Sequence, residues 1–246
     1  MIDTYKKSGI KLAGIALLML ALNLLWQAAY AQVVPAHFYN KTIISGMNKV
    51  EGVVFDHLNR IYAWEKNGVI WIIDSNGIKN PVPLLDITDE VGSWVDHGLN
   101  GVVLDPDYRH NGYIYVNYTV DRHYLLYYGT SNYNADSNLY NNATIARVTR
   151  YTVDTSNFNS VIPGSRKILI GQTKQTGIPV THKSHGSCAM VFATDGTLLI
   201  ATGDGSSYGQ MDNGSGATTW AAQALLDSII TPQQNVALSG RSRFKV

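Results

Sequence analysis

One strand–turn–strand pattern occurs three times along this chain, and it limits the possible folds more than any other feature does. In each copy an apolar segment leads into an Asp-containing turn, and a second apolar segment follows. The copies open at residues 52–56, 101–105 and 189–193. Short apolar segments separated by Asn, Gly, Asp and Pro are typical of antiparallel strands joined by tight turns.

The first two copies continue into complete four-segment units, and the third stops after two segments. The apolar segments lie at residues 52–56, 60–64, 68–74, 82–87, 101–105, 112–118, 146–153, 166–170, 188–192 and 198–202. A Tyr-, Asn- and Ser-rich insertion, about residues 121–142, interrupts the second unit. This repetition predicts an all-β fold, a β-propeller of about two and a half blades. A β-sandwich also has regularly spaced strands, but it does not predict the same element at the start of each unit.

The N-terminal residues have the features of a secretory signal. Lys6, Lys7 and Lys11 precede an apolar stretch at residues 13–25, and an Ala-Tyr-Ala cleavage pattern ends at Ala31. We expect residues 1–31 to be a cleaved signal peptide and residues 32–246 to be a secreted or periplasmic protein without a membrane span. A membrane anchor is the alternative, but a spanning helix needs about 20 apolar residues.

The composition excludes several classes of function. The formal net charge is +1, which provides no electrostatic basis for binding nucleic acid. The chain has a single cysteine, so it cannot form an intramolecular disulfide. Glycine-rich nucleotide-binding motifs, the HExxH motif and the CxxC motif are absent from the sequence.

Two histidines occupy matching positions and are candidates for a functional site. His185 lies where a polar loop enters the first segment of the third unit, and His97 lies at the same point of the second unit. A loop histidine can act as a general base if it reaches a substrate proton. Asp96 precedes His97 and could bind a sugar hydroxyl or a quinone oxygen, or it could satisfy the backbone of its own loop.

Three other acidic positions have different interpretations. Asp204 lies in a Gly-Asp-Gly loop and is a candidate calcium ligand, although its spacing does not match an EF-hand. Asp105 and Asp195 resemble catalytic carboxylates, but Pro106 and Gly196 follow them directly. Both sequences are better explained as hairpin turns.

Two segments resemble elements of the glucose/sorbosone dehydrogenase family. Residues 98–108 read GLNGVVLDPDY and residues 111–116 read NGYIYV, which is similar to the element GLLGxAFHPDF…NGYLYV. Residues 185–204 are similar to a second element, HxxGxLxFGPDGxLYxxxGD. The likeness covers most of residues 46–208.

This resemblance implies a six-bladed propeller that uses pyrroloquinoline quinone (PQQ) and Ca²⁺ to oxidise an aldose sugar, with an external electron acceptor. His185 would take the proton of the anomeric hydroxyl as hydride passes to the quinone. Asp96 matches a position that contacts the cofactor region, and His97 beside it is assigned to the same cofactor-binding group.

The chain also departs from the family pattern. Ser187 and Cys188 replace a paired glycine, Ala189 replaces Arg or Thr, and Asn100 replaces a leucine. The family's quinone-binding arginine and its calcium ligands lie in later blades. We therefore expect the chain to be the N-terminal part of such a propeller and to be inactive alone. Two alternatives stay open, a non-catalytic binding propeller of the same family and a calcium-dependent lactonase-like hydrolase.

Overall fold

The computed structural model describes residues 37–203, together with residues 19, 35, 224 and 227–229. The chain divides into two compact units, Met1–Ile43 and Ile44–Val246. All strands and helices named below belong to the second unit. The expected signal peptide lies almost wholly outside the described residues. Within the described part, the structure has no helix long and apolar enough to cross a membrane.

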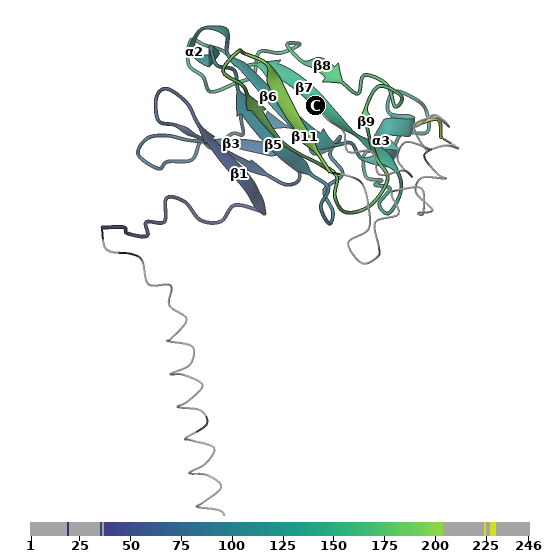
Figure 1. Cartoon of the computed structure of the whole chain (residues 1–246), viewed down its shortest axis with the longest axis horizontal. Coiled ribbons are helices and arrows are strands. Elements are labelled where there is room, and N and C mark those ends of the chain that lie inside the picture. Colours follow the sequence, from purple (N-terminus) through teal and green to yellow (C-terminus); the bar gives the residue numbers. More distant parts are fainter. Residues whose placement is uncertain (1–18, 20–34, 36, 204–223, 225–226, 230–246) are drawn as a thin grey trace, which may run out of the picture. The chain divides into compact units, whose positions relative to one another are not determined.

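The first unit of the sequence forms a four-stranded antiparallel sheet (Figure 1). Its strands follow chain order: β1 (Val50–Phe55), β2 (Ile61–Glu65), β3 (Val69–Ile73) and β4 (Leu85–Asp86). Each lies within or beside one of the apolar segments expected from the sequence. The predicted meander is confirmed for this unit.

The second unit repeats this arrangement. It contains β5 (Leu99–Leu104), β6 (Tyr113–Thr119), β7 (Thr144–Thr152) and β8 (Lys167–Ile170), again antiparallel and in chain order. A short strand that the sequence pattern did not indicate, β9 (Ile178–Val180), also pairs with β7. The insertion lies between β6 and β7, so it lengthens a connection without changing the order of the strands.

The third unit is a hairpin of β10 (Ser187–Phe192) and β11 (Leu198–Thr202). β5 packs against both β1 and β10, so the first strands of the three units lie next to one another. A four-stranded sheet, a five-stranded sheet that repeats its strand order and adds β9, and a two-stranded hairpin confirm the predicted all-β, partial β-propeller fold.

The Asp-containing turns have the structural role expected from the sequence. The Oδ1 atom of Asp105 accepts hydrogen bonds from the backbone N–H of Asp107 and from the side chain of Asn111, at 2.9 and 2.8 Å. Asp195 accepts from the N–H of Thr197 at 2.9 Å, and Gly196 adopts a left-handed φ of 83°. These carboxylates hold hairpin turns in shape.

A register shift also recurs near the start of each unit. The shift falls between Val50 and Gly52, between Leu99 and Gly101, and between Ser187 and Met190. β-Bulges of this kind bend a strand and redirect its side chains. The repeat therefore includes a backbone irregularity as well as the strand order.

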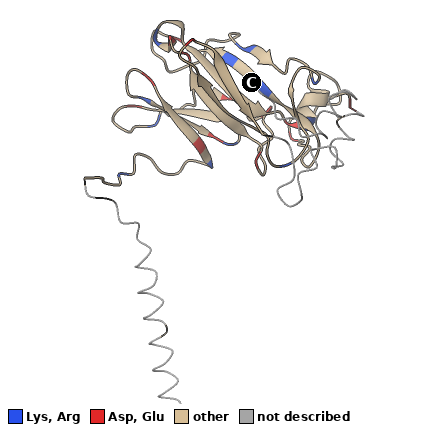
Figure 2. Ribbon diagram, in the orientation of Figure 1, with Lys and Arg blue, Asp and Glu red and all other residues tan. Residues whose placement is uncertain are grey.

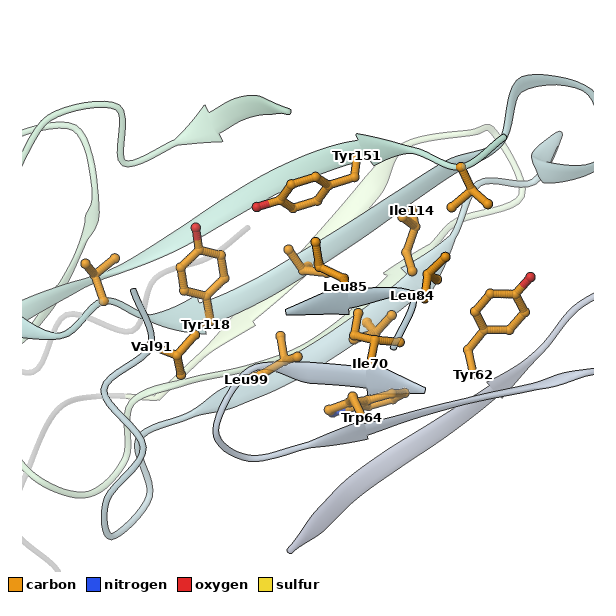
Figure 3. Packing of buried hydrophobic residues seen from close by; sticks show 14 of the residues in the cluster. Tyr62, Trp64, Ile70, Leu84, Leu85, Val91, Leu99, Ile114, Tyr118 and Tyr151 are labelled. Atoms are coloured by element: carbon orange, nitrogen blue, oxygen red, sulfur yellow. The ribbon is translucent and has the colours of Figure 1, made fainter. Parts of the chain in front are cut away.

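Most of the hydrophobic core lies between the first two sheets (Figure 3). Tyr62 and Ile70 from the first sheet pack in one cluster with Leu99, Ile114 and Tyr118 from the second, and all five are fully buried. Burial of large apolar side chains is the main stabilising contribution in a domain without disulfides. Leu99, the first residue of β5, belongs to this core, and the candidate loop with Asp96 and His97 directly precedes it.

Two short helices were not expected from the sequence. α2 (Tyr108–Asn111) follows the Asp105 turn, and α3 (Arg122–Tyr127) opens the Tyr-rich insertion. The side chain of Asp121 accepts the N–H groups of His123 and Tyr124, which caps the start of α3. Charged residues are scattered in small groups over the described ribbon (Figure 2).

Candidate functional site

The two histidine loops occupy the same backbone position in successive units. The carbonyl of Gly98 accepts the N–H of Thr119 at 2.9 Å, and the carbonyl of Gly186 accepts the N–H of Gly203 at 2.7 Å. These bonds join the entry of β5 to the end of β6, and the entry of β10 to the end of β11. His97 and His185, each one residue earlier, are therefore equivalent positions of the repeat, as the sequence indicated.

The same loops bind each other directly. The backbone N–H of Asp96 donates to the carbonyl of Lys183 at 3.4 Å, and the Nε2 atom of His97 lies 3.0 Å from the carbonyl of His182. A carbonyl only accepts, so Nε2 of His97 carries the proton. Residues 94–98 and 181–186 thus form one surface, which we call the histidine loops.

His97 is the buried member of the pair. Its side chain is packed edge to face against Trp94, and the residue is only 1% exposed. Burial lowers the pKa of His97, because a charged imidazole would lose its hydration, although the bond to the His182 carbonyl acts in the opposite direction. This ring joins the two loops, and its contact with a cofactor stays a prediction.

His185 is the exposed member, and its backbone is unusual. It has a left-handed φ of 55°, a conformation that costs energy for most residues other than glycine. A Cβ atom on Gly203 would lie 2.1 Å from the carbonyl oxygen of His185. The glycine after β11 is therefore required by the close approach of the His185 backbone, which ties the second family-like element together.

His182 and Ser184 complete this loop, and sequence reasoning did not assign them a role. The Nδ1 atom of His182 accepts the N–H of Ser184 at 3.2 Å and lies 2.8 Å from the Ser184 hydroxyl. The pKa of His182 is lowered, first by burial and then by the positive charges of Lys183 and His185. The His-x-Ser-His spacing was the one available signal for this internal bond.

A buried polar pair fixes β10 below the loops. The Ser187 hydroxyl lies 2.7 Å from the amide nitrogen of Asn117 on β6 and 2.9 Å from its amide oxygen. Both residues are buried, so breaking the pair leaves polar atoms without water. Ser187, one of the departures from the family pattern, is thus used to connect two sheets.

Asp96 lies at the exposed edge of the histidine loops, beside polar groups from the first two sheets. The Lys66 ammonium donates to the carbonyl of Val95, and the Asn100 amide donates to the carbonyl of Asp96 at 2.9 Å. The Oδ1 atom of Asn100 is buried, and no described residue donates to it. Val95, a β-branched residue, has a left-handed φ of 48°, which marks local backbone strain.

No metal site is seen among the described residues. They contain no group of three or more His, Cys, Asp or Glu side chains arranged to hold an ion. The predicted calcium ligand Asp204 lies outside the described residues. The structure therefore brings together Asp96, His97 and His185 on adjoining loops but contributes nothing on Asp204.

Comparison with known proteins identifies relatives of two kinds. The sequence profile of the glucose/sorbosone dehydrogenase family matches residues 50–223. Human Hedgehog-interacting protein is 25% identical over 209 residues, which are 82% of this chain and 27% of that protein. The mouse protein is 26% identical over 204 residues, 80% of this chain and 27% of the relative. The chain thus spans about a quarter of the length of these relatives.

Solved structures give a matching result for the fold. A glucose dehydrogenase aligns with a TM-score of 0.50 and 14% identity, over 68% of this chain and 42% of that one. The PQQ-bound aldose sugar dehydrogenase of Streptomyces coelicolor aligns with a TM-score of 0.45 and 18% identity, over 69% and 42% of the two chains. Because the family profile covers well over half of its residues, the chain belongs to the glucose/sorbosone dehydrogenase family and has a sugar dehydrogenase-like propeller fold.

Proposed function

We propose that this chain is part of an exported quinoprotein that oxidises an aldose sugar at its anomeric carbon. In this proposal residues 1–31 direct export, and residues 32–246 form the N-terminal part of the propeller. The substrate is an aldose, PQQ is the cofactor, and an external acceptor removes the electrons. The observation that carries the proposal is the exposed His185, held at the entry of β10 in the region matched by the family.

His185 is suited to the role of general base. Its side chain is exposed, while its backbone is held through Gly186 and Gly203 at the end of a paired strand. Imidazole accepts a proton readily near neutral pH, and a positioned base contributes about 10²–10⁴-fold to rate. His185 would remove the proton of the anomeric hydroxyl, and the rigid strand would keep its ring oriented towards the sugar.

The groups around the histidine loops fit an anionic quinone. PQQ carries carboxylates, and each histidine loop has a lysine in or beside it. Lys183 belongs to the second loop, and the Lys66 ammonium donates to the Val95 carbonyl of the first while also pairing with Glu51 at 3.3 Å. Asn100 offers a buried amide oxygen that lacks a donor among the described residues and could accept a ligand hydroxyl. When bound, the quinone would supply the hydride acceptor. Asp96 would lie on the cofactor side of the site, with His97 behind it holding the loops together.

A second candidate is a propeller that binds a protein partner. The similarity to Hedgehog-interacting protein favours it, because that relative is named for a protein interaction and covers four fifths of this chain. Such a protein would have no need of a quinone. The two candidates therefore differ in a property that can be measured directly.

Titration of the exported protein, as its organism makes it, with PQQ, followed by absorbance, separates the two. The dehydrogenase proposal expects a saturable spectral change that is stronger with Ca²⁺ and weaker in the Lys66→Ala variant. Lys79→Ala is the control. It also removes a lysine charge, but that charge lies over the ring of Trp71 on β3 and not in the histidine loops. No saturable change with or without Ca²⁺ would overturn the dehydrogenase proposal and favour the binding propeller.

A further inference from the structure

Two aromatic residues at the loop that carries Asp96, Trp94 within it and Tyr140 beside it, have no part in the proposed reaction. The ring centroids of Trp94 and Tyr140 are 5.6 Å apart, with the planes inclined by 43°. Trp94 also packs edge to face on His97, at 5.1 Å. Tyr140 remains 42% exposed. The exposed Tyr140 ring is thus backed by Trp94, a residue of the histidine loops that also packs on His97.

Local bonds hold Tyr140 in this position. The side-chain amide of Asn142 donates to the Tyr140 carbonyl at 2.6 Å, and Asn141 between them has a left-handed φ of 59°. This turn lies at the end of the insertion that follows β6. The insertion is not part of the repeated strand pattern. It places the aromatic ring of Tyr140 at the edge of the candidate site.

Polar groups accompany the aromatic pair. Asp96 is exposed two residues after Trp94, and the buried Oδ1 atom of Asn100 has no donor among the described residues. The strained Val95 lies between Trp94 and Asp96. Small-molecule sites typically combine aromatic surface with a few placed polar groups. A pyranose ring matches both parts, since its C–H face is apolar and its hydroxyls hydrogen-bond.

We infer that Tyr140, backed by Trp94, is a second sugar-binding subsite beside the histidine loops. It would take the second pyranose ring of a disaccharide or longer aldose whose reducing-end ring faces His185. The bond from the Asp96 N–H to the Lys183 carbonyl places the two subsites on adjoining loops. The inference rests on the proposed function for its chemistry, but binding alone can test it.

Calorimetric titration of the exported protein, as its organism makes it, with glucose, maltose, cellobiose and lactose tests the subsite. At least one disaccharide is expected to bind roughly five- to tenfold more tightly than glucose, as aromatic packing of about 1 kcal/mol implies. Tyr140→Ala should remove this preference, whereas Tyr140→Phe should retain it. Leu139→Ala, a change at the neighbouring residue, is the matched control and should leave the preference intact.

Several outcomes would overturn the subsite. These are equal affinity of the wild-type chain for glucose and every disaccharide, no sugar binding, or an unchanged preference in a folded Tyr140→Ala variant. Circular dichroism and the thermal midpoint establish that each variant is folded. Disaccharide preference without PQQ binding would keep the subsite and reject the dehydrogenase, whereas PQQ binding without that preference would do the reverse.

Discussion

The histidine loops before β5 and before β10 share one backbone position but present their histidines differently. His97 is buried against Trp94 and bound to the carbonyl of His182. His185 is exposed, and its own backbone has a left-handed φ. The strand pairing that follows each histidine is the same. Repetition of the backbone therefore does not repeat the chemistry, because the neighbouring loop decides which ring meets solvent.

Under the proposed function, this difference suits two otherwise equivalent residues to separate tasks. A buried neutral imidazole can hold loops together but is shielded from a substrate. An exposed imidazole at the entry of a paired strand can exchange a proton with a ligand. The comparison can be tested at three points, starting with the change that should have the largest effect.

The largest effect is expected from His185→Ala. In the exported protein as its organism makes it, supplied with PQQ and Ca²⁺, this change should lower kcat for aldose oxidation by about 100-fold or more, because the general base is lost. A dye-linked assay measures the rate. His110→Ala is the control, since His110 is an exposed histidine on α2. Equal rates for the two variants would remove His185 from the mechanism.

Gly203→Ala should destabilise the fold by roughly 1–3 kcal/mol, because the added methyl would meet the His185 carbonyl at 2.1 Å. Urea denaturation measures the free energy of unfolding. Thr119, the last residue of β6, makes the equivalent backbone bond to Gly98 and already carries a side chain. Thr119→Ala should therefore cost less, about 1 kcal/mol. If Gly203→Ala proved neutral, the close backbone approach would not constrain this loop.

The smallest effect concerns the pH dependence of stability. Burial lowers the pKa of His97, so below about pH 6.5 the unfolded chain takes up a proton at this residue before the folded chain does. The free energy of unfolding should therefore fall on acidification, by up to about 1.4 kcal/mol between about pH 7.5 and pH 5.5.

His97→Gln should not show this part of the pH dependence, and denaturation of both proteins at the two pH values measures the difference. The lowered pKa of His182 acts in the same direction, but His182 is present in both proteins and its contribution cancels. Parallel losses in the two proteins would show that His97 is not held neutral by burial.

Local sequence patterns were sufficient for the strands, because each depends on neighbours in the chain. Apolar segments and Asp-containing turns predicted β1–β8, β10 and β11, and the turn role of Asp105 and Asp195. The short α3 was missed because Asp121 and an aromatic-rich stretch do not show a clear apolar period. β9 has only three residues and contains a proline, so it too carries little signal.

The sequence by itself determined the repeated four-stranded units, the family and the equivalence of His97 with His185. Only the tertiary structure decided that His97 is buried, that Asn117 pairs with Ser187, and that Tyr140 packs on Trp94. The physical reason is distance along the chain. The Asn117–Ser187 pair joins residues 70 apart, and the His97–His182 contact joins residues 85 apart. Such contacts depend on how whole sheets and loops pack, which no local period records.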